Sequence, residues 1–176
     1  MSSTVDIAVV PVEADRDAEL IHSWTSQERA VFWGMLDKPV KEVRDIYAWI
    51  QEQPHLAAYL VHADGAPVAL FQTYDPFVDE IGEFYDRKAG DVGIHLLIGP
   101  GKRGPGVSAA LLQGLADWVW SDPAHARIVF EPDARNDKSV AVLHRLGAEI
   151  GPQVDLPHKR AQFGFLTREA WFSGRR

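Results

Sequence analysis

The first half of the chain alternates between short apolar runs, which indicate strands, and stretches with apolar residues at helical spacing, which indicate helices. In chain order the pattern predicts a strand over residues 5–12, a helix that carries Leu20, Ile21 and Trp24, a helix between Pro39 and Pro54, and strands over residues 56–63 and 67–74. The pair Asp64-Gly65 tolerates positive φ and favours a tight turn between the last two runs. We therefore expect these two strands to form an antiparallel hairpin.

The second half begins with an irregular segment and then returns to regular alternation. Residues 77–90 are acidic and aromatic without clear periodicity, which predicts a loop. After it the pattern predicts a strand over 91–99, a helix over 107–119, a strand over 126–130, a helix over 136–146 that Gly147 ends, and strands over 150–156 and 160–166. This order predicts a single domain over residues 1–176 of the α/β class, with one mixed, mostly antiparallel sheet flanked by helices.

Composition narrows the class of protein. The 176 residues suit one compact domain, and 46% hydrophobic with 24% charged residues is ordinary globular usage. Zero cysteines exclude a disulfide framework and a thiolate nucleophile, and a formal charge of -7 disfavours nucleic-acid partners. No apolar stretch is long enough to span a membrane and no signal-peptide pattern is present, so we expect a cytoplasmic protein. The seven histidines form no metal-ligand spacing, so no metal site is predicted.

A glycine-rich turn lies between the strand over 91–99 and the helix over 107–119. Its sequence is Gly99-Pro100-Gly101-Lys102-Arg103-Gly104-Pro105-Gly106. Glycines let the backbone approach a ligand closely, and a helix N-terminus with nearby cations favours anions such as a pyrophosphate. A surface loop that merely caps a helix explains the same residues equally well. The Gly-Lys-Ser/Thr ending of nucleotide triphosphatases and the dinucleotide G-x-G-x-x-G spacing are both missing.

The end of this turn, Gly104-Pro105-Gly106, resembles the Q/R-x-x-G-x-G/A turn of the GCN5-related N-acetyltransferase (GNAT) superfamily. The segment over residues 136–148 resembles the N-x-x-A/S-x-x-x-Y-x-K-x-G-F block of the same superfamily. The resemblance implies the GNAT fold, with acetyl- or succinyl-coenzyme A as co-substrate and no metal. It also implies contacts with that co-substrate from Leu97, Ile98, Lys102, Arg103, Gly104, Gly106, Val107, Asn136 and Ser139.

Three residues depart from the superfamily pattern. Gly101 replaces the glutamine or arginine that opens the turn, and Pro105 lacks a backbone donor, so Lys102 or Arg103 is expected to supply an interaction instead. Many relatives carry, at the position of Leu143, a tyrosine that protonates the departing thiolate. Because leucine cannot donate a proton, another acid or the solvent must do so.

Within the superfamily, residues 71–76, 90–99 and 130–136 resemble the siderophore-biosynthesis N-acyltransferases. The resemblance implies acylation of the hydroxylamine nitrogen, or the amine, at the end of a lysine-, ornithine- or cadaverine-like substrate. This branch pairs a histidine with an acidic residue at the positions of His95 and Glu131. The implied roles are a general base for His95 and an orienting carboxylate for Glu131.

The residues themselves leave these roles open. His95 titrates near neutral pH and lies on the strand face that Gly93 leaves open, where a general base is reasonable. Without the family, a core histidine is the favoured interpretation, with Glu131 pairing with Arg135 or capping the next helix. Asp133 competes with Glu131 for the role of orienting carboxylate.

The acidic and aromatic residues around the loop predict a site for a long cationic substrate. The predicted substrate-binding residues are Tyr74, Asp75, Asp79 and Asp133. A solvated acidic loop explains any single one of these carboxylates as well. Trp24, Trp49 and Trp118 occupy helical positions that indicate packing in the core.

Other functions fit the same pattern. Within the fold, an aminoglycoside 6'-N-acetyltransferase or a ribosomal-protein N-terminal acetyltransferase is a close alternative. Outside catalysis, an acyl-coenzyme A-binding regulatory domain is the alternative that the missing tyrosine at Leu143 favours. The expected partner is a small-molecule amine or hydroxylamine, and the protein is expected to be a monomer or homodimer.

Overall fold

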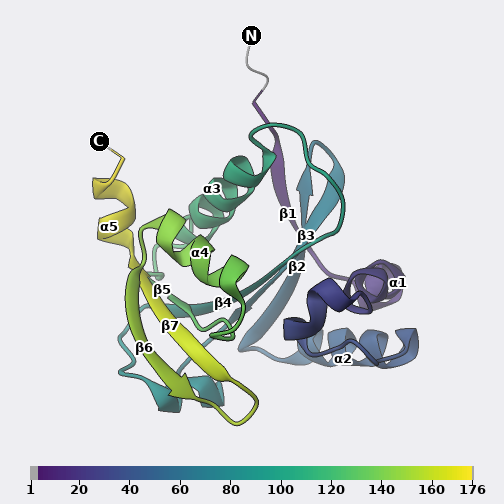
Figure 1. Ribbon diagram of the computed structural model, residues 1–176, viewed down its shortest axis with the longest axis horizontal. Helices are drawn as coiled ribbons and strands as arrows, with labels where there is room; N and C mark the ends of the chain where they lie inside the picture. The colour runs from purple at the N-terminus through teal and green to yellow at the C-terminus, as the bar shows by residue number, and fades with distance from the viewer. Residues whose placement is uncertain (1–3, 176) are drawn as a thin grey trace. The chain divides into compact units, whose positions relative to one another are not determined.

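One sheet of seven strands, in the order β1-β2-β3-β4-β5-β7-β6, organises the computed structural model, which describes residues 4–175 (Figure 1). Residues 1–3 and 176, which the predicted domain includes, lie outside the described residues. The predicted α/β class, with a mixed and mostly antiparallel sheet flanked by helices, is confirmed. The elements are β1 (Ile7–Pro11), α1 (Ala14–Thr25), η1 (Glu28–Trp33), α2 (Val40–Glu52), β2 (Leu56–Ala63), β3 (Ala66–Tyr74), η2 (Glu80–Phe84), β4 (Asp91–Ile98), α3 (Val107–Trp120), β5 (Arg127–Phe130), α4 (Asp137–Leu146), β6 (Glu149–Asp155), β7 (Arg160–Thr167) and α5 (Arg168–Ser173).

The chain divides into two compact units. The first consists of the residues up to 72 together with residues 96–118, and the second of residues 73–95 together with residues 119 onward. Strands β3 and β4 each contribute residues to both units.

In the first unit, β1 pairs antiparallel with β2, with Ile7 opposite Ala63. The turn that follows β2 has positive φ at both Asp64 and Gly65, as the predicted tight turn requires. Helices α1 and α2 lie side by side in this unit (Figure 1). Their buried residues pack with those of β2 and β3, and the centre of this core comprises Ile21, Val43, Tyr47, Leu60 and Leu70.

In the second unit, a parallel strand pair is flanked by antiparallel pairs. Residues 91–93 of β4 run parallel to residues 127–129 of β5, β5 pairs antiparallel with β7, and β7 pairs antiparallel with β6. Helix α4 begins at the N-cap Asn136 and ends at Gly147, which has a φ of 75°. Its Leu143 is only 2% exposed, because it packs against Gly164 of β7, where an added Cβ would lie 2.5 Å from the leucine Cδ2. The residue at the position where the resemblance implies a tyrosine is therefore part of the core.

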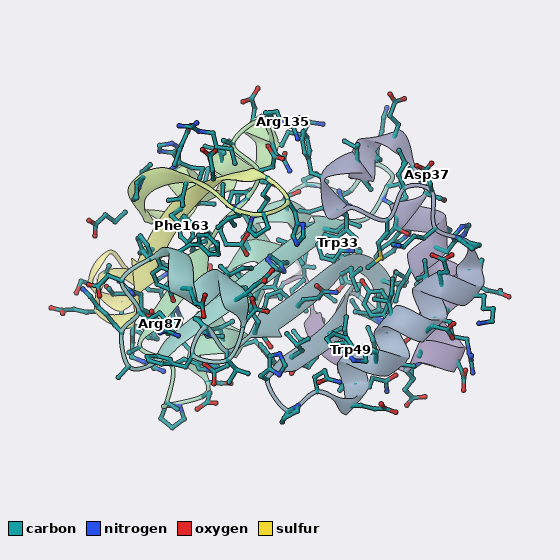
Figure 2. The ribbon with its side chains drawn as sticks, turned by 90° about the horizontal axis from the view of Figure 1, so that it is seen from below. Trp33, Asp37, Trp49, Arg87, Arg135 and Phe163 are labelled. Carbon is teal, nitrogen blue, oxygen red and sulfur yellow. The ribbon has the colours of Figure 1, made fainter. Side chains whose placement is uncertain are left out.

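Three short helices and one tryptophan differ from the sequence prediction. The pattern does not predict η1 or α5, and η2 lies inside the predicted loop over 77–90, because turns of five or six residues are too short to show helical periodicity. The prediction that Trp49 packs in the core is wrong, since it is 54% exposed (Figure 2). The apolar stripe of α2 runs through Val43, Tyr47 and Ile50, and Trp49 falls outside that stripe. Trp24 is buried as predicted.

Neither a membrane span nor a metal cluster is found in the part of the chain that the structure describes. No helix within residues 4–175 is both long and apolar enough to cross a bilayer. Over the same residues, no group of three or more His, Asp or Glu side chains is placed to hold a metal ion.

Candidate active site

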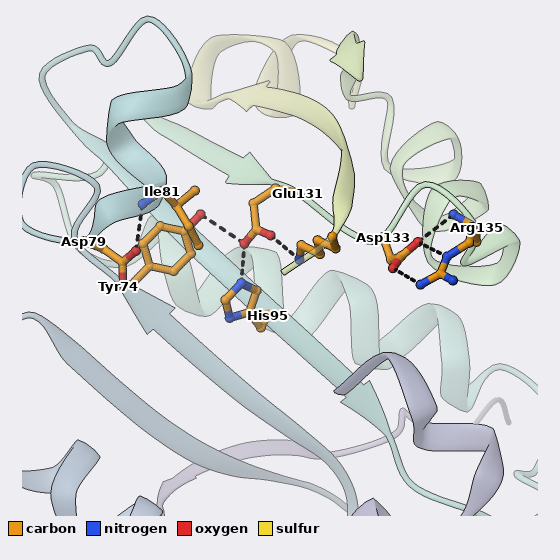
Figure 3. Close-up of polar contacts among 8 residues, drawn as sticks. Tyr74, Asp79, Ile81, His95, Glu131, Asp133 and Arg135 are labelled. Carbon is orange, nitrogen blue, oxygen red and sulfur yellow. Dashed lines mark hydrogen bonds and ion pairs between the residues drawn. The ribbon is translucent and has the colours of Figure 1, made fainter. Parts of the chain in front are cut away.

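His95 and Glu131 meet because their strands are parallel neighbours. Asp91 lies opposite Arg127 and Gly93 opposite Val129, so the same register places His95 level with Glu131, one residue beyond the end of β5. Figure 3 shows the two side chains pointing toward each other, with the Nε2 of His95 hydrogen-bonded to Oε1 of Glu131. The pair that the sequence analysis singled out is thus in direct contact.

Three donors converge on the buried carboxylate of Glu131, which is 1% exposed. The Tyr74 hydroxyl donates to Oε1 over 3.1 Å, and His95 Nε2 contacts the same oxygen. The Lys159 ammonium donates to the other oxygen, Oε2, over 2.6 Å. A buried carboxylate no longer accepts hydrogen bonds from water, so it needs donors from the protein. Here both of its oxygens accept hydrogen bonds from protein groups.

The charges around Glu131 keep it ionised. Burial alone would raise the pKa of Glu131, but the positive charges and hydrogen bonds of His95 and Lys159 outweigh burial and hold its pKa below the ordinary value. Burial raises the pKa of Tyr74 well above its usual range, and the negative charge of Glu131 adds to this effect. At neutral pH the cluster therefore contains a carboxylate and a protonated phenol, which donates its hydrogen bond.

The orientation of His95 determines which ring nitrogen can take a proton. Because Nε2–H donates to an ionised carboxylate, the lone pair of the neutral ring lies on Nδ1. The side chain is 33% exposed, so the ring is near solvent while its partner is not. A histidine with one nitrogen held by a buried carboxylate is the arrangement expected of a general base.

The space above Gly93 is occupied by the ring of Tyr74 and is not open to a substrate. The strand face beside Gly93 was predicted to be open, but a Cβ at Gly93 would lie 1.9 Å from Cζ of Tyr74. The tyrosine ring fills that space, and its centroid lies 5.2 Å from that of the His95 ring. Gly93 therefore allows Tyr74 to reach Glu131 rather than leaving room for a substrate.

Gly93→Ala is expected to lower the free energy of unfolding by about 1–3 kcal/mol, because the added methyl group overlaps the buried ring of Tyr74. Urea unfolding at neutral pH measures the change. Gly104→Ala is the matched control, since a Cβ there meets only Val107 Cγ2 at 3.9 Å and leaves the fold unstrained. Equal stabilities of the two variants would mean that the Tyr74 ring is not confined above Gly93.

Asp133, the other candidate for the carboxylate that orients His95, is hydrogen-bonded to Arg135 instead. Its oxygens accept hydrogen bonds from the backbone N–H of Arg135 at 2.9 Å, from Nε at 3.0 Å and from Nη2 at 2.8 Å. The hydrogen bond with the Arg135 side chain lowers the pKa of Asp133. In Figure 3 the pair Asp133–Arg135 lies apart from the contact between His95 and Glu131. Arg135, which the alternative interpretation assigned to Glu131, thus pairs with Asp133.

The other predicted substrate residues shape the segment that follows β3. Tyr74 is buried and donates to Glu131. Asp75 is exposed and accepts from the backbone N–H of Phe77 at 2.9 Å. Asp79 caps η2 by accepting from the N–H of Ile81 at 3.0 Å (Figure 3). The two aspartates hold the backbone of this loop, and their predicted contacts with a substrate stay predictions.

The predicted co-substrate residues of the first unit lie around the glycine-rich turn. Arg103 folds back onto the turn, where Nη2 donates to the carbonyl oxygens of Gly99 and, at 3.4 Å, of Val68. Its Nε is buried without a hydrogen-bond partner, and burial, with the nearby charge of Arg29, lowers the pKa of Arg103. The remaining predicted residues are exposed or half-buried and comprise Leu97, Ile98, Lys102, Gly104, Gly106 and Val107.

The predicted co-substrate residues of the second unit form one helix cap. The side-chain oxygen of Asn136 accepts from the backbone N–H of Ser139 at 3.3 Å, at the N-terminus of α4. Asparagine is among the residues preferred at this position because it satisfies an otherwise unpaired helical N–H. The motif block that begins at Asn136 therefore also marks the start of the helix.

Lys159 is not among the site residues that the sequence pattern predicts. It precedes β7 and is 28 residues away from Glu131 in the chain. No motif in its sequence neighbourhood indicates this partner, and the nearby Asp155 pairs with Arg160 instead. Only the pairing of β7 with β5 could have suggested the contact, and the sequence pattern does not predict that pairing.

Known proteins resemble this chain over most of its length. Residues 13–156 match the family described as "Acetyltransferase (GNAT) domain". The chain is 34% identical to an N(5)-hydroxyornithine:cis-anhydromevalonyl coenzyme A-N(5)-transacylase of Beauveria bassiana, over 89% of this chain and 35% of that protein. It is 26% identical to an N-hydroxyputrescine acetyltransferase of Acinetobacter baumannii, over 89% of this chain and 76% of that protein. The chain thus spans about a third of the length of the fungal relative.

Solved structures share the fold. The crystal structure of the aminoglycoside acetyltransferase AAC(6')-Ib with coenzyme A and kanamycin matches with a TM-score of 0.84, over 97% of this chain and all of the other. At 20% sequence identity this likeness concerns the fold alone.

Proposed function

Since this chain belongs to the GNAT family of acetyltransferases, we propose that it is an acyl-coenzyme A-dependent N-acyltransferase that acts on the terminal hydroxylamine or amine of a lysine-, ornithine- or cadaverine-like substrate. The acyl group is proposed to be of the acetyl or succinyl type. The product of such a transfer to a hydroxylamine nitrogen is a hydroxamate, the iron-chelating group of hydroxamate siderophores.

The contact between His95 and Glu131 is the observation that carries this proposal. An acceptor nitrogen must lose a proton as it forms its new bond to the acyl carbon. Nδ1 of His95 is the proposed acceptor of that proton, and Glu131 stabilises the resulting imidazolium because it is ionised and buried beside Nε2. The carboxylate also holds the ring in the tautomer that this step needs.

The reaction itself is a direct transfer. The nitrogen attacks the thioester carbonyl carbon, a C–N bond forms, the C–S bond breaks, and the proton passes from the nitrogen to His95. The thiolate is protonated by solvent or by a group other than residue 143, since Leu143 carries no proton and is buried in the core. His95 then returns its proton to water.

The residues predicted to hold the acyl donor suit an anionic ligand. Gly101 and Gly106 of the turn have positive φ, a backbone conformation that other residues rarely adopt, and Lys102 is an exposed cation between them. In the second unit, the N-terminus of α4 at Asn136 and Ser139 is the corresponding predicted contact. Acyl-coenzyme A carries phosphates that groups of this kind bind.

The acceptor class is supported by the relatives. The names of the two curated proteins state that they act on N(5)-hydroxyornithine and N-hydroxyputrescine, which are hydroxylated diamine-type molecules. The formal charge of -7 and the acidic residues between 75 and 86 suit a cationic acceptor. Cytoplasmic localisation, a single domain over 1–176 and a monomeric or homodimeric state stay predictions.

The test is an acceptor panel with purified protein. Acetyl- or succinyl-coenzyme A is offered with N-hydroxylysine, N-hydroxycadaverine, kanamycin or a ribosomal N-terminal peptide, and free thiol release is followed. We expect kcat/KM for a hydroxylamine to exceed that for kanamycin by about 10²-fold or more, because a matched polar acceptor leaves no site group unpaired.

Each other outcome replaces the proposal with a definite alternative. Turnover of kanamycin alone makes the protein an aminoglycoside acetyltransferase, and turnover of the peptide alone makes it an N-terminal acetyltransferase. Binding of coenzyme A without thiol release for any acceptor makes it a non-catalytic acyl-coenzyme A-binding domain.

A further inference from the structure

Among the described residues, Lys159 is the lysine whose ammonium pairs with the buried carboxylate of Glu131. Its Nζ lies 2.6 Å from Oε2 of Glu131, and His95 contacts the opposite oxygen, Oε1. The carboxylate therefore lies between the ammonium of a lysine and the imidazole ring of a histidine. No residue motif assigns Lys159 a function.

The position of Lys159 in the fold removes part of the water around its ammonium group, which costs solvation free energy. Residues 156–159 form the tight turn between β6 and β7, closed by a hydrogen bond of 2.8 Å from the N–H of Leu156 to the carbonyl oxygen of Lys159. The turn points the lysine inward, so its side chain is only 24% exposed and its partner carboxylate is fully buried. A buried ion pair roughly offsets its own desolvation penalty, so its presence is weak evidence for a role in stability.

We propose that Lys159 is a positioning residue that compensates the charge of Glu131, so that the carboxylate does not hold a proton on His95 and the ring is available as a base. The inference rests on the proposed function, because it assigns a task to His95. Without Lys159, the uncompensated carboxylate would stabilise the imidazolium form of His95 more strongly, and the ring would hold its proton to higher pH.

The direction of this effect does not depend on where the proton is located. Consider one proton added to the pair of a neutral His95 ring and an ionised Glu131. Either the ring takes it and becomes an imidazolium, or the carboxylate takes it and the ring stays neutral. When the pair loses this proton, both cases lead to the same state, in which a neutral ring lies beside an ionised Glu131 that contacts the ammonium of Lys159. The ammonium stabilises the product of the loss, so it moves the loss to lower pH.

The other charged groups near the cluster are paired among themselves. Asp133 pairs with Arg135, Asp91 pairs with Arg127 and accepts from Tyr85, and Glu80 lies 3.7 Å from His158. Tyr74 stays protonated because its pKa is raised, and Asp79 caps η2. Lys159 is thus the cation in contact with the carboxylate that can compensate it when His95 is neutral.

The experiment compares Lys159→Met, Lys159→Arg and the surface control Lys41→Met in the full chain. Lys41 is exposed on α2 and pairs only with Asp45 among the ion pairs of the described residues. Two quantities are measured for each protein: the midpoint of the acid limb of kcat/KM against pH, and the midpoint of the His95 ring-proton titration by NMR.

In Lys159→Met we expect both midpoints to rise by about one pH unit, so activity falls most at low pH and recovers toward that of the unaltered protein at high pH. Lys159→Arg retains the charge and should leave both midpoints in place, and Lys41→Met should do the same. If Lys159→Met does not fold, Lys159→Gln, which can still donate to Glu131 without a charge, is measured instead.

An equal loss of activity at every pH, with unmoved midpoints, would overturn the proposal and leave Lys159 a structural residue. The NMR titration needs no turnover. A protein that acylates no acceptor would therefore refute the proposed function, while the shift of the His95 titration would still decide the role of Lys159.

Discussion

Replacing His95 with glutamine is expected to lower kcat/KM by about 10²–10⁴-fold, the range associated with the loss of a general base. Glutamine can donate an N–H to Glu131 as Nε2 does, but it has no atom that takes a proton at neutral pH. The fold and the carboxylate therefore keep their partner while the proposed chemistry is lost. Thiol release with the best hydroxylamine acceptor measures the effect.

Two controls separate this loss from other causes. His55→Ala, just before β2 in the first unit, removes a histidine that has no predicted role and should retain full activity. Calorimetric titration should give His95→Gln the same affinity for acetyl-coenzyme A as the unaltered protein, because none of the predicted co-substrate contacts is changed. Near-normal turnover in His95→Gln would rule out His95 as the base.

Glu131→Gln is expected to lower the free energy of unfolding by about 3 kcal/mol and to reduce kcat/KM by about 10²-fold. Oε1 accepts from Tyr74 and His95 and Oε2 accepts from Lys159, so either orientation of the amide brings its NH2 group against a donor. The cost lies at the low end for a broken buried ion pair, since the Lys159 side chain is 24% exposed and its ammonium can turn toward water.

The stability difference should depend on pH. The folded-state pKa of Glu131 lies below its ordinary value of 4.5, so its ionised form stabilises the fold above that pH. That stabilisation is lost as the pH falls through the depressed folded-state pKa, whereas the glutamine variant does not titrate. Urea unfolding should therefore show the gap between the two proteins narrowing in acid.

Glu52→Gln provides the matched control for this prediction, because Glu52 is exposed at the end of α2. A surface change of this kind should alter stability by no more than about 0.5 kcal/mol at any pH. A gap between Glu131→Gln and the unaltered protein that stays constant down to pH 3 would show that the carboxylate is not the source of the stabilisation.

The position of Leu143 bears on the choice between enzyme and binding domain. Its burial against Gly164 gives the leucine a packing role, so the missing tyrosine does not by itself indicate a lost activity. The alternative of a non-catalytic domain then has to explain a half-exposed histidine held by a buried, ionised carboxylate. The two variants of this pair, His95→Gln and Glu131→Gln, test that explanation directly.

The sequence by itself determined the elements and the candidates for chemistry. Apolar periodicity is a local property, so it located the long helices and the strands, and Asp64-Gly65 indicated its hairpin because positive φ is a property of those residues. His95 and Glu131 were singled out because residues 90–99 and 130–136 resemble a family branch that pairs a histidine with an acidic residue at these positions. The short helices η1, η2 and α5 were missed because five or six residues are too few to show the helical repeat of apolar positions.

Only the tertiary structure decided what these residues contact. Gly93 is filled by Tyr74, Asp133 is bound to Arg135, and Lys159 completes the carboxylate site from 28 residues away. Such contacts depend on which strands pair and in which register, and that choice follows from the packing of the whole sheet rather than from any local pattern. The sequence thus determined which side chains could take part in chemistry. The pairing of β5 with β4 and β7 decided which of them contact the buried carboxylate of Glu131.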